Sequence, residues 1–178
     1  MSLAVLQRLD STGPAMNTFA FRPGTDARHP YFVLLHTEDA PDAEIWSQYV
    51  AALSARIAHG TSTINVFAVT DGGGPDPGQR RALAAAFARD HFGSITHVFT
   101  TSSVTRGIVT AFHWLARSRA VAHPPEEFTA ICARCNIAAA AVLEDLVRLQ
   151  AELPPVALLE AISDGVHSSG LRPRVRHS

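Results

Sequence analysis

The sequence predicts an α/β fold, with a mixed and mostly parallel sheet of about five strands. Three short β-branched segments, at 66–70, 97–101 and 120–122, each run into a turn and then into an amphipathic segment. Strands that alternate with helices of this length are typical of βα units on a largely parallel sheet. We therefore expect the helices that follow these strands to pack on one sheet.

The N-terminal part of the chain adds shorter candidate strands. Segments 3–6 and 19–21 each have the composition of a short strand, and the continuous apolar run 31–35 predicts a central one. A helix follows from about residue 41 to residue 59. Its apolar side chains recur at helical spacing and form one stripe for burial: Trp46, Val50, Leu53 and Ile57.

The next βα unit carries a clear helix-start signal. After a strand at 64–70, Asp76 is a good N-cap, Pro77 fits the first helical position, and Gln79 completes a capping box. The helix after the following strand is expected to bury its own apolar stripe, which consists of Val104, Ile108, Ala111 and Leu115.

From Phe128 onward an apolar stripe continues at i+3 or i+4 spacing until Pro154 and Pro155. The segment is either one long helix or two helices with a joint near Asn136, and a last short helix is expected over 156–162. These elements divide the chain into three predicted parts: an α/β domain over 1–137, a C-terminal helical extension of the same domain over 138–165, and a flexible tail over 166–178.

The extension must bury its apolar stripe against some partner surface, because leaving such side chains in water is costly. The stripe can pack on this domain, or it can mate with its symmetry copy in a two-fold dimer. We favour the homodimer, because the core pattern is complete without the extension. The four side chains expected at this interface are Val142, Leu146, Leu149 and Leu153.

Composition excludes several classes of protein. Hydrophobic residues make up 47% of the 178 positions and charged residues 17%, which predicts a globular chain. The net charge of −1 argues against nucleic-acid binding. No apolar run approaches the roughly 20 residues of a membrane span, so we expect no membrane insertion. We also expect no signal peptide and a cytoplasmic location.

Cys132 and Cys135 form a CxxC motif, which is typical of redox-active and metal-binding sites. Redox CxxC pairs sit at a helix N-terminus, whereas this pair lies about two turns into a predicted helix. A structural zinc site needs four ligands, and the chain has no second CxxC. We therefore expect two core thiols, no metal and no other cofactor.

The best functional candidate is the hydroxyl-rich segment 100–107, beside the glycine-rich loop 71–78. Free N–H groups at a helix start favour an anion, and the residues expected to contact a ligand or partner are Asp71, Asp76, Ser102, Ser103, Thr105 and Arg106. In the alternative interpretation a serine merely caps the helix, while Arg106 pairs with Asp71 or Asp76. No Gly-x-Ser-x-Gly elbow is present, so we name no catalytic residue.

These segments resemble the STAS-like superfamily, named for sulfate transporters and anti-sigma-factor antagonists, in an uncharacterised bacterial branch. The resemblance covers roughly residues 17–136. It rests on a strand ending in Asp71, then Pro77-Gly-Gln-Arg-Arg-Ala-Leu83, Val98-Phe99, Arg106-Gly107 and Trp114-Leu115, and finally Arg119-Ala-Val-Ala-His123 with Glu126-Glu127-Phe128.

The resemblance implies a regulatory module, but one motif departs from the family. Anti-sigma antagonists carry a phosphorylatable Ser or Thr at the start of the helix after this strand, and here Pro77 or Gly78 falls at that position. The phosphorylation switch is therefore expected to be missing. Two hypotheses follow: a non-enzymatic regulatory or protein-interaction module, or a small-ligand domain, conceivably an enzyme, with a pocket for an anion, nucleotide or lipid at the strand carboxyl ends.

Overall fold

A computed structural model describes residues 17–24, 29–59, 63–87, 93–116 and 119–170. The predicted strand at 3–6 lies outside these residues. The elements follow in the order β1 (Phe19–Pro23), β2 (Tyr31–His36), α1 (Ala43–Ala58), β3 (Ile64–Thr70), α2 (Pro77–Phe87), β4 (Ser94–Phe99), α3 (Ser103–Ala116), β5 (Ala120–His123), a 3-10 turn (Pro125–Glu127), α4 (Phe128–Arg134), α5 (Ala139–Gln150) and α6 (Ala157–Gly170).

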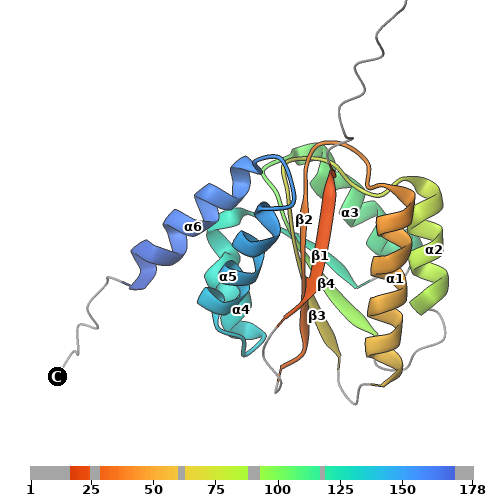
Figure 1. Ribbon diagram of the computed structural model, residues 1–178, viewed down its shortest axis with the longest axis horizontal. Helices are drawn as coiled ribbons and strands as arrows, with labels where there is room; N and C mark the ends of the chain where they lie inside the picture. Colours follow the sequence, from red (N-terminus) through yellow and green to blue (C-terminus); the bar gives the residue numbers. More distant parts are fainter. Residues whose placement is uncertain (1–16, 25–28, 60–62, 88–92, 117–118, 171–178) are drawn as a thin grey trace, which may run out of the picture.

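The five strands form one mixed sheet in the order β1-β2-β3-β4-β5 (Figure 1). Strands β1 and β2 pair antiparallel, and the other three pairs are parallel. The predicted α/β fold class is thus confirmed, including the parallel pairing of β3 with β4. Because the strands follow one another in sequence order, each right-handed crossover places its helix on the same face of the sheet.

One face of the sheet is covered by the helix that follows β2. Alternate residues of β2 and β3 point to this face and pack on α1, as the apolar spacing of that helix predicts. Asp42 begins α1 by accepting hydrogen bonds from the Glu44 and Ile45 amides, at 2.8 and 3.4 Å. The buried cluster here consists of Phe19, Phe32, Leu34, Trp46, Tyr49, Leu53, Ile57, Ile64 and Val66.

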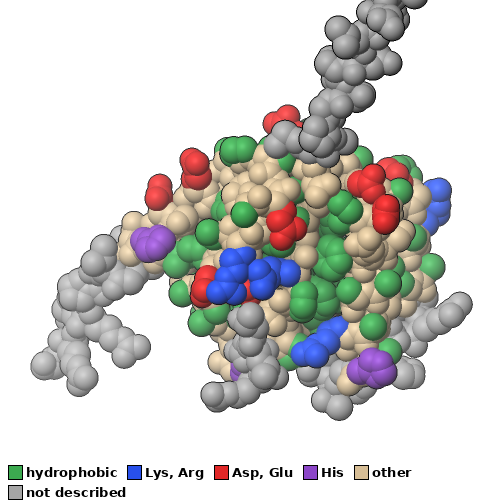
Figure 2. All heavy atoms as spheres, in the orientation of Figure 1, with side chains coloured by type: hydrophobic (Ala, Val, Ile, Leu, Met, Phe, Trp, Pro, Cys, Tyr) green, Lys and Arg blue, Asp and Glu red, His purple; other side chains and the backbone are tan. Residues whose placement is uncertain are grey.

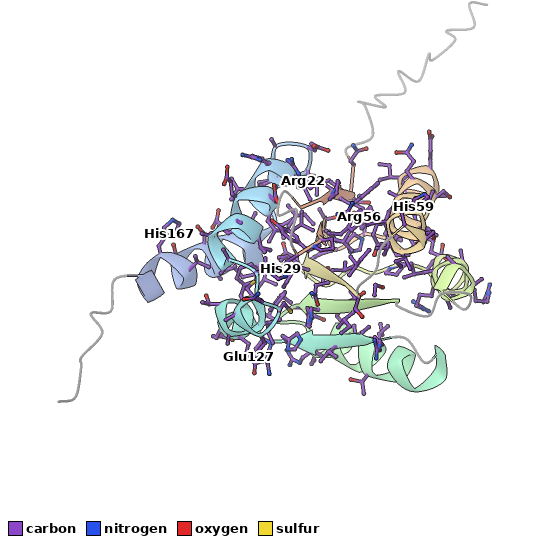
Figure 3. The ribbon with its side chains drawn as sticks, turned by 90° about the horizontal axis from the view of Figure 1, so that it is seen from below. Arg22, His29, Arg56, His59, Glu127 and His167 are labelled. Atoms are coloured by element: carbon purple, nitrogen blue, oxygen red, sulfur yellow. The ribbon has the colours of Figure 1, made fainter. Side chains whose placement is uncertain are left out.

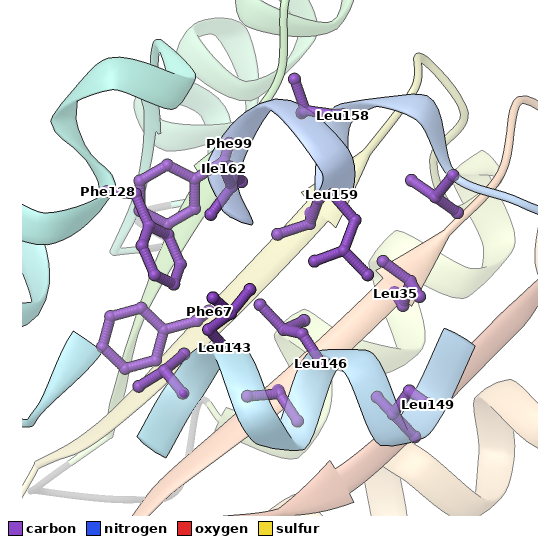
Figure 4. Close-up of a cluster of buried hydrophobic side chains, with 14 of the residues drawn as sticks. Leu35, Phe67, Phe99, Phe128, Leu143, Leu146, Leu149, Leu158, Leu159 and Ile162 are labelled. Atoms are coloured by element: carbon purple, nitrogen blue, oxygen red, sulfur yellow. The ribbon is translucent and has the colours of Figure 1, made fainter. Parts of the chain in front are cut away.

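The opposite face is covered by the last three helices. Seen from below, α1 and α2 lie on one side of the sheet and α4, α5 and α6 on the other (Figure 3). Side chains from the second face of the sheet and from these helices form the larger core cluster (Figure 4), whose largest members include Tyr31, Phe67, Phe99, Phe128, Leu146, Leu149 and Ile162. Both faces of the central strands are therefore buried, as is usual for parallel sheets.

This arrangement corrects the expected dimer interface. Val142, Leu146, Leu149 and Leu153 are each at least nine-tenths buried within the protomer. The stripe packs on the sheet face that α1 leaves uncovered, so these four side chains are not available to a second copy. The prediction was wrong because it took the core to be complete without the extension, whereas the first helices all cover the same face.

The segment from residue 128 to residue 150 forms two helices, which is one of the two predicted arrangements. The joint lies at Asn136, whose φ of +58° is left-handed. Asparagine adopts this conformation more readily than other non-glycine residues. The Asn136 and Ile137 amides donate to the Ala133 and Cys132 carbonyls at 3.0 Å each, which closes the end of α4.

The C-terminal helix is longer than the sequence predicts. Helix α6 continues to Gly170, past residue 166, where a flexible tail was expected. Val166 packs against the larger core cluster, and the Ser163 carbonyl lies 2.7 Å from His167 Nδ1, so this last turn has contacts that hold it. Among the described residues, no helix is both long enough and apolar enough to cross a membrane.

Candidate functional site

The carboxyl ends of β3 and β4 form a loop platform, made of the loop 71–76 and the start of α3. Buried Thr70 is the last residue of β3, and buried Thr100 directly follows β4. The Thr70 hydroxyl accepts from the Gly72 amide at 3.2 Å, and the Thr100 hydroxyl accepts from the Ser102 amide at 3.1 Å. Both hydroxyls are therefore used to hold the turns that leave the sheet.

Asp71 binds a different part of the chain from the one that the sequence predicts. Its carboxylate accepts from the amides of Ala157 and Leu158, at 2.8 and 2.9 Å. These amides open α6, so Asp71 caps this helix from a loop 86 residues earlier. A carboxylate at a helix N-terminus satisfies free donors and complements the helix dipole.

Asp76 forms the predicted capping box. Its carboxylate accepts from the Gln79 amide, and its own amide donates to the Gln79 side chain, both at 2.8 Å. Gln79 is buried, and its amide nitrogen donates to the Pro41 carbonyl at 2.7 Å. The start of α2 is thereby joined to the start of α1.

The hydroxyl-rich start of α3 is joined to the same loop. Ser102 caps the helix by accepting from the Thr105 amide at 3.2 Å, and Ser103 is exposed beside it. The buried Thr105 hydroxyl donates to the Gly72 carbonyl at 2.8 Å. Arg106 donates to the carbonyls of Thr100 and Thr101, at 3.3 and 3.0 Å, instead of pairing with Asp71 or Asp76.

The structure thus brings Ser102, Thr105 and Arg106 next to the loop that contains Asp71. Asp76 lies further along this loop and binds Gln79. Each of these polar side chains forms bonds within the chain, as the capping interpretation of the serine expects. Arg106 binds backbone carbonyls where that interpretation expected an aspartate.

Helix α3 exposes the apolar stripe that was expected to be buried. Val104 is 71% exposed and Ile108 48% exposed, and Ala111 is also exposed; the side chain of Leu115 lies outside the described residues. The buried position at this end of α3 is instead Thr105, whose hydroxyl is bonded to the Gly72 carbonyl. Over residues 103–111, where the side chains of α3 are described, the exposed positions also include Ser103, Gly107 and Thr110, and none of these exposed positions carries a charge.

A second cluster of polar side chains lies on the face of the sheet that α4 covers. His97 Nδ1 lies 3.2 Å from His123 Nε2, and His97 Nε2 lies 3.5 Å from the Cys135 sulfur. His123 Nδ1 lies 3.3 Å from a carboxylate oxygen of Glu127, which Figure 3 labels. We call this series Cys135, His97, His123 and Glu127 the thiol–imidazole chain.

Sequence reasoning missed the thiol–imidazole chain because its members are far apart in the sequence. Strand register brings the two histidines together, because His97 pairs with Val121 and Phe99 pairs with His123. One signal could have found part of it. His97 is two residues before the core residue Phe99, and residues two apart in a strand share a face.

Burial dominates the ionisation of this cluster. It lowers the pKa of His97 to about 4 and also lowers the pKa of His123, against the opposing effect of Glu127. It raises the pKa of Cys135, and it raises the pKa of the fully buried Cys132 to about 12. The resting cluster therefore contains neutral imidazoles and protonated thiols.

The cluster does not form a metal centre. Within the described part of the chain, no group of three or more His, Cys, Asp or Glu side chains is placed to hold a metal ion. The geometry explains this result, because the two nitrogens of His97 face different neighbours, and a single ion cannot reach both.

A buried carboxylate joins α5 to the N-terminal hairpin. Asp145 is only 1% exposed and accepts from the Tyr31 hydroxyl at 2.8 Å. Its other oxygen lies 3.5 Å from Arg22 and 3.5 Å from Arg148, which also pairs with Glu144. Figure 2 shows basic and acidic side chains gathered together in this region, so the cluster is locally balanced.

No protein-family model matches the chain, and no curated protein or solved structure is significantly similar to it. The resemblance to the STAS-like superfamily therefore remains a prediction from the sequence motifs.

Proposed function

We propose that this protein is a cytoplasmic, non-enzymatic regulatory or protein-interaction module of STAS-like type, which binds its partner through the start of α3 and the adjoining loop. The observation that carries the proposal is the exposed, uncharged apolar stripe of α3, with Val104 and Ile108 at its centre. Exposed apolar side chains that share one helix face favour a protein contact more than a small polar ligand.

The proposed surface is tied to the sheet by hydrogen bonds within the chain. Thr105 and Arg106 tie the start of α3 to the ends of β3 and β4. A preformed surface loses little conformational freedom on binding, which favours affinity. The stripe carries no charge, so the expected partner surface is an apolar helix or strand face without a strong charge of its own.

The loop also fits a module without the usual phosphorylation switch. Pro77 and Gly78 begin α2. They fall at the position where the anti-sigma antagonists that the sequence resembles carry the acceptor hydroxyl, and neither residue has one.

The small-ligand alternative has less support. A pocket at the strand carboxyl ends would need polar groups free to bind a ligand. Thr70, Thr100 and Asp71 are instead used for turns and for the cap of α6.

Site-specific crosslinking tests the proposal. A photo-crosslinking residue is placed at position 104, and a matched one at Val147, which is 52% exposed on α5. We expect a protein adduct from position 104 that Ile108→Asp abolishes and Val147→Asp leaves intact. An identical set of adducts from both positions, or an adduct that survives Ile108→Asp, would contradict the proposed surface. A second copy of this chain as the adduct would identify the interaction as self-association.

A further inference from the structure

We propose that the outer edge of β5 pairs antiparallel with β5 of a second copy of this chain, so that two sheets become one and two α3 helices meet across a two-fold axis. Because it uses the apolar stripe of α3, this pairing rests on the proposed function and names a second copy of the chain as the partner. It does not involve α5, whose apolar side chains are buried in the larger core cluster.

The outer edge of β5 is open in the part of the chain that the structure describes. β5 is the last strand of the sheet, and Figure 3 shows it at the margin of the sheet with α3 beside it. The Arg119 carbonyl accepts from the Thr96 amide of β4 at 2.8 Å, so this side of the chain faces β4. Because successive peptide groups of a strand point to opposite sides, the N–H and C=O groups of Ala120 and Ala122 point outward. Such a row of outward groups is a template for another strand.

The two edges of the sheet differ in the features that prevent pairing. Strand β1, at the other edge, contains Arg22 and Pro23, and proteins use charged residues and proline to keep an edge strand from pairing. Over 120–122, β5 contains neither a charged residue nor proline, and two of its three side chains are alanines. The third, Val121, is 44% exposed. Of the two edges, β5 is therefore the one suited to accept a second strand.

A two-fold axis at Val121 gives a register that uses the outward groups of both alanines. Ala120 then lies opposite Ala122 of the second copy, and Ala122 lies opposite its Ala120, so each pair can exchange two hydrogen bonds. The two Val121 side chains lie directly opposite each other on one face of the joined sheet. Each covers apolar surface that the single chain exposes.

The charges at the two ends of β5 favour self-pairing in this direction. Arg119 is exposed at the start of the strand, and Glu126 and Glu127 are exposed just after its end. Arg134 lies 3.9 Å from Glu127, so two carboxylates at this end face a single guanidinium. In the antiparallel register, Arg119 of the second copy lies opposite His123, beside these carboxylates. Each copy thus supplies the cation that the other lacks, which favours a second copy over an unrelated strand.

Helix α3 supplies the apolar area that a four-residue strand cannot provide. It packs beside β5, so pairing of the two edges brings the two α3 helices next to each other. Helices in contact lie about 8–10 Å apart, which is close enough for their side chains to interdigitate. The exposed Val104 and Ile108 can then lose their contact with water against α3 of the second copy.

Light scattering on the full chain tests the pairing. We expect the unaltered chain to have the mass of two chains and Val121→Lys the mass of one, because two lysines would lie directly opposite each other across the axis. Val147→Lys, at an exposed position of α5, is the matched control and should keep the mass of two chains. Circular dichroism checks that both variants fold.

A charge reversal tests the direction of pairing. Arg119→Glu should weaken the dimer, and Glu126→Arg introduced into the same chain should restore it. A double variant that dimerises no better than Arg119→Glu would contradict the antiparallel register.

Val121→Cys tests the register without any added charge. Residues opposite each other in a non-hydrogen-bonded pair have Cα atoms about 4.5 Å apart, within the range of a disulfide. Mild oxidation of Val121→Cys should therefore give a covalent dimer on a non-reducing gel. The unaltered chain, which retains Cys132 and Cys135, and Val147→Cys are the controls and should not be linked.

Two results would overturn the pairing: a mass of one chain at every protein concentration measured, or a dimer that Val121→Lys leaves intact and Val121→Cys does not link. Ile108→Asp separates this outcome from that of the proposed function. If the chain is monomeric and position 104 still yields an adduct with another protein, the pairing is wrong and the α3 surface stands. If Val121→Cys links two chains and Ile108→Asp leaves the dimer unchanged, β5 pairs as proposed and the α3 surface is wrong.

Discussion

Asp71 shows how one side chain can join distant parts of this chain. It directly follows β3 in the loop platform and caps α6 through two backbone amides. Asp71→Ala leaves both amides without this acceptor, and we expect the free energy of unfolding to fall by about 1–2 kcal/mol. Urea denaturation measures the change. Asp164→Ala, at an exposed position of α6, is the control and should stay within about 0.5 kcal/mol.

His97 makes stability depend on pH in a defined direction. Its pKa falls from 6.5 to about 4 on folding, mainly through burial. Between these values the unfolded chain binds more protons than the folded chain, so stability decreases as the pH falls through this range. We expect the urea midpoint to drop from pH 7 to pH 5, and the drop to be smaller in His97→Gln. An equal drop in both proteins would contradict this account, and His167→Gln, at an exposed position, serves as the control.

At the scale of one element, α3 shows that an apolar pattern in the sequence does not by itself decide which side chains are buried. Thr105 is buried and bonded to Gly72, while Ile108 is half exposed. Thr105→Ala should therefore cost about 1–2 kcal/mol, because it leaves a carbonyl without its donor. Ile108→Ala should change stability by no more than about 0.5 kcal/mol. Chemical denaturation of both variants checks this order, and the reverse order would mean that the helix is rotated to bury its stripe.

The same helix shows what the sequence could and could not predict. The β-branched strands and the Asp76 capping box were readable, because strand composition and helix starts are local signals. The stripe at Val104 and Ile108 identified an apolar face correctly, but a pattern does not say what covers that face. The rotation depends on the Thr105 bond to a loop 33 residues earlier, which no local signal carries.

In the candidate sites, too, the sequence predicted what depends on neighbouring residues and missed what depends on distant ones. The sequence placed Ser102 as a possible cap and grouped Arg106 with the glycine-rich loop, since both depend on neighbours along the chain. The thiol–imidazole chain was not foreseen, because strand register and the turn before α4 bring His97 together with Cys135. Long-range register is the part of a fold that composition and spacing leave open.

At the scale of the whole molecule, the burial of α5 changes what a charged substitution will do. Leu146 is fully buried in the larger core cluster, whereas its neighbour Val147 is exposed. Leu146→Glu places a carboxylate among apolar side chains, and we expect the protein to lose its cooperative thermal transition. Val147→Glu should fold normally. Circular dichroism melts distinguish the two, and a folded Leu146→Glu protein would show that the core does not need this helix.

Truncation tests whether the helical extension is part of the domain. A chain of residues 1–137 lacks α5 and α6, so the second face of its sheet is uncovered. We expect this chain to aggregate or remain unfolded by size-exclusion chromatography and circular dichroism. A chain of residues 1–170, which ends with α6, is the matched control and should behave as the full chain does. A folded, monomeric product of 1–137 would show that the first part is an independent domain.

The order of the strands has a consequence for biosynthesis. A ribosome delivers the chain from its N-terminus, and here the sheet with its first three helices is complete before α4 emerges. Until then one face of the nascent sheet is covered by helices, and the other, apolar face is exposed to water. Every segment that covers this face is made after the sheet, so the apolar face stays uncovered until α4, α5 and α6 have been synthesised.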